Sequence, residues 1–124
     1  IVLQRSNSLD FTISETNGAN IKLVPQILES IFFKNSPLHD GAIVIDKNNI
    51  IATRVILPVS DKKNIPSKYG LRHRAALGIT EKTDALVIVI SEQTGKIVYV
   101  KNGEFFSFKT TTALKETLAQ DISE

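Results

Sequence analysis

Two short polar clusters stand out in this sequence, because they hold both of its histidines and set charged side chains beside glycine. The first spans residues 38–42 and reads Leu-His-Asp-Gly-Ala, and the second spans residues 69–74 and reads Tyr-Gly-Leu-Arg-His-Arg. Glycine lets another group approach the backbone closely. We interpret the two clusters as one site that handles phosphate groups.

The first cluster offers a histidine and an aspartate side by side, His39 and Asp40. Such a pair at the start of a strand can bind a divalent cation, and the carboxylate can also take a proton from a hydroxyl group. Asp-Gly is also one of the commonest turn pairs, so an ordinary turn is the alternative interpretation of Asp40 and Gly41.

The second cluster places Arg72 and Arg74 in the first turn of a predicted helix. The helix macrodipole disfavours cations there unless an anion binds beside them. Free N–H groups and guanidinium groups match phosphate oxygens in geometry and charge, and a solvated helix face is the alternative. Glu92 ends an apolar strand, where catalytic groups often gather, although a glutamate in such a turn can also be merely solvated.

Composition excludes several classes of function. The 124 residues fit one domain, residues 1–124, and the absence of cysteine excludes disulfides and thiolate chemistry. A net charge of +2 is too small to make nucleic acid the expected partner. The longest apolar run, residues 85–90, is far too short to span a bilayer. Because the chain starts at Ile1 and contains no methionine, we expect that upstream residues are missing.

The hydrophobic pattern interleaves strands with helices, and several strands form hairpins. We therefore expect an α/β fold: a single-domain mixed, mainly antiparallel central sheet with helices on its faces. Strands are predicted at residues 1–4, 21–23, 42–45, 50–57, 85–90, 96–101 and 104–108. Helices are predicted at residues 8–14, 24–33 and 72–77, the last ended by Gly78, and a final helix is capped by residues 110–112. We expect residues 58–70 to form an exposed loop.

Four stretches in this order resemble a known family: residues 35–42, 56–60, 72–79 and 83–86. Together they resemble the diadenylate cyclase (DAC) domain of bacteria, most closely the CdaA type. The resemblance covers nearly the whole chain, and the pairing of Asp-Gly-Ala with Arg-His-Arg at this separation is highly specific.

The resemblance implies that two ATP molecules are condensed into cyclic di-AMP with release of two pyrophosphates, with Mg²⁺ or Mn²⁺ as the cofactor. Asp40 would activate the ribose 3′-hydroxyl. The implied metal ligands are His39, Asp40 and Glu92. The implied adenosine contacts are Gly41, Ala42 and Leu57. The residues implied to contact the phosphates are Gly70, Leu71, Arg72, His73, Ser91 and Glu92. Arg74 is implied to support the catalytic site.

Because the product is twofold symmetric and one domain would hold one ATP, the resemblance also implies a homodimer or higher homo-oligomer. It further implies a cytoplasmic domain anchored to the cell membrane through a missing N-terminal segment. Three departures from the family pattern concern Ile56, Leu71 and Gln93. The alternatives are a catalytically silent nucleotide-binding module and a metal-dependent phosphohydrolase that uses His39 and Asp40.

Overall fold

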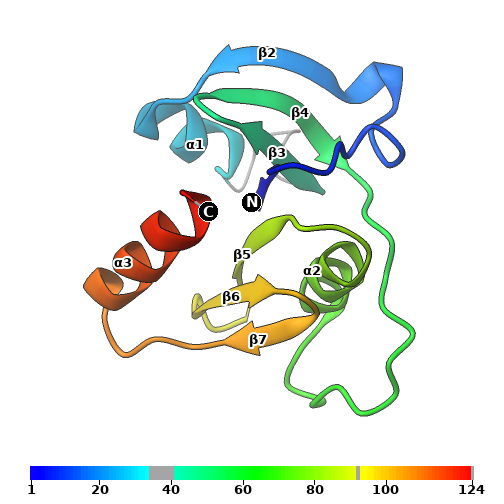
Figure 1. Ribbon diagram of the computed structural model, residues 1–124, viewed down its shortest axis with the longest axis vertical. Helices are drawn as coiled ribbons and strands as arrows, with labels where there is room; N and C mark the ends of the chain where they lie inside the picture. The colour runs from blue at the N-terminus through cyan, green and yellow to red at the C-terminus, as the bar shows by residue number, and fades with distance from the viewer. Residues whose placement is uncertain (34–40, 92, 124) are drawn as a thin grey trace.

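A seven-stranded sheet forms the centre of the protein in the computed structural model, which describes residues 1–33, 41–91 and 93–123. The strand order is β2-β4-β3-β1-β5-β6-β7 (Figure 1). β1 lies parallel to β3, and the other described strand pairs are antiparallel. The strands are β1 (Val2–Leu3), β2 (Gly18–Lys22), β3 (Ala42–Asp46), β4 (Asn49–Val55), β5 (Leu86–Ile90), β6 (Ile97–Lys101) and β7 (Glu104–Phe106). The predicted mixed, mainly antiparallel sheet is confirmed.

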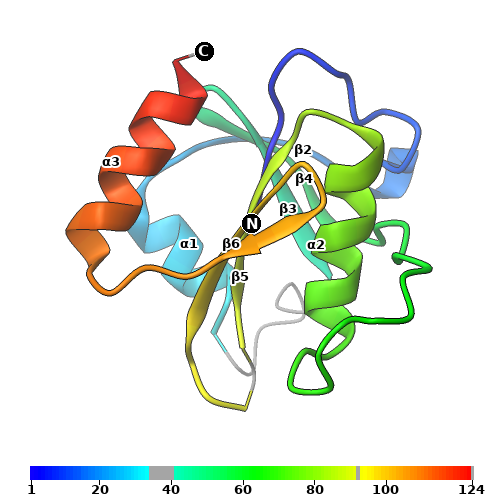
Figure 2. The ribbon, with the colours of Figure 1, turned by 60° about the horizontal axis from the view of Figure 1, so that its bottom comes forward.

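Three α-helices cover the two faces of this sheet: α1 (Pro25–Ile31), α2 (Leu71–Lys82) and α3 (Thr111–Ile122), beside a short 3₁₀ turn at Glu15–Asn17. Figure 2 shows α2 on one side of the sheet and α1 and α3 on the other. Side chains alternate between the faces of a strand. In β3, Val44 therefore packs in the core cluster that includes α2, whereas Ile43 and Ile45 pack toward α1.

The predicted end of α2 at Gly78 is wrong, because the helix continues to Lys82. A Cβ at Gly78 would lie 1.9 Å from the carbonyl oxygen of Pro58, so the helix touches the neighbouring backbone at this point. The Ser60 N–H also donates to the Arg74 carbonyl at 3.0 Å. Gly78 is thus a packing residue, and it allows the segment that follows β4 to lie directly on α2.

The predicted helix at residues 8–14 is also wrong, because side chains hold this segment as a loop. The Leu9 N–H donates to Oε1 of Gln4 at 2.9 Å, and the Asp10 N–H donates to Oγ of Ser8 at 3.2 Å. The Leu9 side chain is fully buried. These local bonds compete with the helical hydrogen bonds of the backbone.

The last helix begins as predicted, because Oγ1 of Thr110 accepts a hydrogen bond from the Ala113 N–H at 3.1 Å. Its far end is tied to the sheet through Asp121, which accepts from the Tyr99 hydroxyl at 2.7 Å and from Nζ of Lys101 at 3.0 Å. Within the described residues, every helix is too short or too polar to cross a membrane.

Candidate functional site

The topology brings the starts of β3 and α2 to the edge of the sheet where β5 ends. β1 is parallel to β3 and antiparallel to β5, so the start of β3 and the end of β5 share one edge. Only three residues separate α2 from β5, so the helix runs back along the strand and begins at this same edge. A cavity of about 650 Å³ opens there. That volume suits a ligand the size of a nucleotide.

Apolar side chains form much of the cavity wall. Leu57 and Val87 are buried members of the core, and Ala42 packs against the same cluster. An aromatic base or another flat apolar group could lie against this part of the wall.

Another part of the cavity wall is built from the first turn of α2. Gly70 is the N-cap residue and supplies no side-chain cap, and Leu71, which begins the helix, is 70% exposed. The first N–H groups of an α-helix lack partners within the helix. They are therefore available to an anion, and the helix dipole favours negative charge at this end.

Arg72 carries positive charge to the point where α2 and β5 meet. Its Nη1 donates to the Ile90 carbonyl at 3.0 Å, which holds the guanidinium group beside Ser91. Oγ of Ser91 accepts from the N–H groups of Gln93 and Thr94 at 3.2 and 3.3 Å, so this hydroxyl orders the turn after β5.

His73 is buried, with 5% of its surface exposed. Its ring stacks on Tyr69 at a centroid distance of 4.7 Å and meets the edge of Phe105 at 6.3 Å. Burial, and then the charge of Arg72, lower the pKa of His73 below the usual histidine value. The imidazole is therefore neutral at pH 7, and it contributes packing and at most one N–H donor rather than positive charge.

The first cluster is described from Gly41 onward. Gly41 has φ +87°, and a Cβ there would lie 2.8 Å from the carbonyl carbon of Arg54, which itself has φ +54°. A shift in strand register separates the Ala42–Val55 pair from the next pair along β3 and β4. Only glycine tolerates both this conformation and this close approach, so Gly41 fixes how the chain enters β3.

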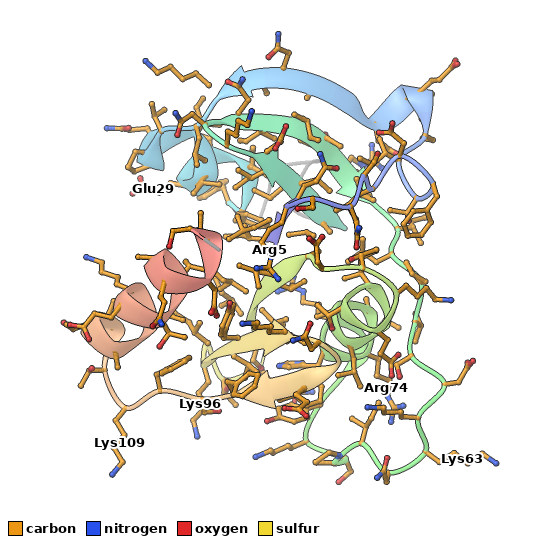
Figure 3. All side chains as sticks on the ribbon, in the orientation of Figure 1. Arg5, Glu29, Lys63, Arg74, Lys96 and Lys109 are labelled. Atoms are coloured by element: carbon orange, nitrogen blue, oxygen red, sulfur yellow. The ribbon has the colours of Figure 1, made fainter. Side chains whose placement is uncertain are left out.

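Most of the predicted substrate contacts line this one cavity: Gly41, Ala42, Leu57, Gly70, Leu71, Arg72, His73 and Ser91. Arg74 does not line it. Figure 3 shows Arg74 reaching from α2 toward the segment of residues 58–70. His39, Asp40 and Glu92 lie outside the described residues, so their predicted roles remain predictions.

Sequence reasoning missed two polar residues that also line the cavity, Ser67 and Lys68. Gln93, named above as a departure from the family pattern, lines it as well. Ser67 and Lys68 belong to the segment predicted only as an exposed loop. Their position just before the Gly70 N-cap was the available signal, because a residue there must lie near the helix start.

The residues that the structure describes offer few ligands for a divalent metal ion. No group of three or more histidine, cysteine, aspartate or glutamate side chains comes together among residues 1–33, 41–91 and 93–123. Divalent Mg²⁺ and Mn²⁺ prefer oxygen ligands, above all carboxylates. The described wall therefore does not form a metal site by itself.

Comparison with known proteins places this chain in a family. Residues 1–105 match the family model described as DAC, the nucleotide-binding domain of the DisA bacterial checkpoint controller. The cyclic di-AMP synthase CdaA of Bacillus subtilis (strain 168) is 38% identical over 124 residues, covering 100% of this chain and 45% of the relative. A diadenylate cyclase of Listeria monocytogenes serotype 1/2a (strain 10403S) is 40% identical over 122 residues, covering 98% and 45%. The chain spans about half the length of these curated relatives.

Solved structures agree with this assignment. A double mutant of DacA from Staphylococcus aureus superposes with a TM-score of 0.90 at 35% identity, covering 97% of this chain and 80% of that one. A Bacillus cereus protein described as a hypothetical membrane spanning protein gives a TM-score of 0.83 at 38% identity, covering 88% and 53%. Fold, family model and relatives agree, and the chain belongs to the diadenylate cyclase family.

Proposed function

We propose that this chain is the catalytic part of a diadenylate cyclase, which joins two ATP molecules into cyclic di-AMP and releases two pyrophosphates. Relatives named diadenylate cyclase or cyclic di-AMP synthase, which align with almost all of this chain, support the proposal. The activity assigned to those full-length proteins comes to this chain as part of the proposal.

One observation carries the assignment to a nucleotide. The cavity joins an apolar wall to the start of α2, and its described wall contains the cations Lys68 and Arg72. Adenosine fits the apolar part near Leu57, and the phosphates fit the helix start and Arg72. This division follows from the preference of phosphate for N–H groups and guanidinium groups.

The chemical step uses Asp40 as the base. The Asp40 carboxylate takes the proton of a ribose 3′-hydroxyl, and the freed oxygen attacks the α-phosphorus of the facing ATP. A new bond from oxygen to phosphorus forms as the bond to pyrophosphate breaks. Arg72 and the N–H groups of the first turn of α2 stabilise the charge that develops on the phosphate oxygens. The same step in the other direction closes the ring.

Two copies of the chain are needed, because each holds one ATP and the product has twofold symmetry. A face-to-face dimer brings each 3′-hydroxyl to the α-phosphate of the other nucleotide. The assembly is a homodimer or a larger homo-oligomer that contains such pairs.

A divalent metal ion, Mg²⁺ or Mn²⁺, completes the site in this proposal, with His39, Asp40 and Glu92 as its ligands. When bound, such an ion neutralises phosphate charge and polarises the phosphoryl oxygens. Attachment to the membrane would come from sequence beyond this chain. The description of the similar Bacillus cereus protein as membrane spanning supports that part of the proposal.

The proposal is tested by incubating the chain with ATP and Mg²⁺ or Mn²⁺ and separating the products by chromatography. We expect cyclic di-AMP from the wild type and at least a hundredfold less from Asp40→Asn, the lower range of general-base catalysis. Equal product from both would remove Asp40 from the mechanism. Tight ATP binding without product would favour the silent nucleotide-binding module.

A further inference from the structure

Lys68 is a cation in the cavity wall to which the proposed mechanism gives no task. It belongs to the segment between β4 and α2, two residues before the N-cap Gly70, and it lines the cavity together with Arg72. Lys68 and Arg72 are the lysine and arginine side chains among the described wall residues. An ammonium group in the wall of a cavity can bind an anionic ligand there.

An aromatic stack holds Lys68 in place. Its Nζ lies over the ring of Tyr69, 5.1 Å from the centroid. The Tyr69 ring is itself packed against His73 and Phe105, with centroid distances of 4.7 and 4.4 Å. The Tyr69 N–H also donates to the Pro66 carbonyl at 3.0 Å, closing a turn. A cation over an aromatic face is attracted to it and loses some of its freedom.

The ammonium group remains able to bind a ligand in this position. Lys68 is exposed, and no described acidic side chain forms an ion pair with it. A cation–π contact uses the charge but leaves N–H donors of the ammonium group available. Arg72, by contrast, uses one of its N–H groups in the hydrogen bond to the Ile90 carbonyl.

The two residues at the start of α2 offer a phosphate no side-chain donor, and Lys68 can supply one. Gly70 has no side chain and Leu71 has no hydrogen-bond donor, so the side-chain contacts with a phosphate must come from neighbouring residues. Lys68 is exposed and so marks the rim of the cavity, whereas the apolar wall around Leu57 and Val87 is buried. The rim is therefore the place for the outer phosphates, and the buried wall is the place for the nucleoside.

We infer that Lys68 is a further substrate-binding residue, which contacts the outer phosphates of the nucleotide, and that Tyr69 positions it. This inference rests on the proposed nucleotide specificity of the cavity but not on turnover. It makes Lys68 a residue that distinguishes a nucleoside triphosphate from a nucleoside.

Calorimetry with two ligands tests this inference without requiring turnover. The ligands are adenosine and an ATP analogue with a methylene group between the α- and β-phosphates. Lys68→Gln should weaken binding of the analogue about two- to fivefold, the upper part of the range for an exposed charge contact, and should leave adenosine binding unchanged. Lys68→Arg should restore most of the affinity, and Tyr69→Leu should reproduce part of the loss.

Lys63→Gln is the matched control. Lys63 is an exposed lysine of the same segment that does not line the cavity, so its removal should leave both affinities unchanged. Thermal unfolding of each variant separates loss of binding from loss of folding. Equal analogue affinity in Lys68→Gln and wild type, or an equal loss for adenosine, would overturn the inference. A selective loss in a chain that makes no cyclic di-AMP would support the role of Lys68 while removing the proposed cyclase activity.

Discussion

Replacing Gly78 by alanine tests the close approach of α2 to the segment that follows β4. Gly78 lies inside α2, and the added methyl group would meet the backbone of the segment that follows β4. The distances would be 1.9 Å to the Pro58 carbonyl oxygen, 2.7 Å to its carbon and 2.9 Å to the Ser60 nitrogen. Ordinary contacts with a Cβ begin at about 3.4 Å, so α2 and this segment must move apart.

Two opposing effects determine the magnitude. Alanine is about 1 kcal/mol more favourable than glycine inside a helix, so propensity alone predicts stabilisation. Overpacking a well-filled site costs about 1–3 kcal/mol, and the upper end applies here because the atoms in the way belong to the backbone. We therefore expect the free energy of unfolding to fall by about 2 kcal/mol and the melting temperature by about 8 °C.

Urea unfolding followed by circular dichroism measures this change. Gly70→Ala is the control, because a Cβ at Gly70 would meet no atom within 4 Å, and its N-cap position limits the expected loss to about 1 kcal/mol. ATP affinity should also fall in Gly78→Ala, because the displaced segment carries cavity residues. A Gly78→Ala protein as stable as the wild type would refute the packing argument.

Three further predictions concern the helix ends and the site. Asp121→Ala removes the acceptor of the Tyr99 hydroxyl and should lower the free energy of unfolding by about 1–3 kcal/mol, measured in urea. Thr110→Ala removes the cap of α3 and should cost about 1 kcal/mol in the same assay. Burial lowers the pKa of His73, so the unfolded chain binds its proton first as the pH falls through about 6.5. The wild type should therefore lose more stability between pH 7 and pH 5 than His73→Phe does, and equal losses would contradict the buried, neutral histidine.

Local patterns predicted the strands and the helix starts well. The unbroken apolar run of β5 indicated a strand buried inside the sheet, and β5 does pair with β1 and β6. Thr110 and Pro25 marked the starts of α3 and α1, because a cap and a first-turn proline act within one turn of the chain.

The error at the end of α2 arose because a distant segment decides the local structure. Gly78 was interpreted as a helix end, because the Pro58 backbone that requires a glycine there cannot be seen in the sequence. The parallel pairing of β1 with β3 likewise depends on the whole sheet. The same limit applies to the cavity. Arg72 could be nominated by residue type, and Gly41 and Ser91 through the family resemblance, but the edge of the sheet that brings them together comes from strand order.

Product stoichiometry in a single reaction tests the central claim most directly. The chain is incubated with ATP and Mg²⁺ or Mn²⁺, and cyclic di-AMP, pyrophosphate and inorganic phosphate are measured together over a range of protein concentrations. A diadenylate cyclase that works as a symmetric pair should release two pyrophosphates for each cyclic di-AMP, at a rate that rises more steeply than protein concentration. Release of inorganic phosphate without cyclic di-AMP, or bound ATP that stays unchanged at every concentration, would contradict it.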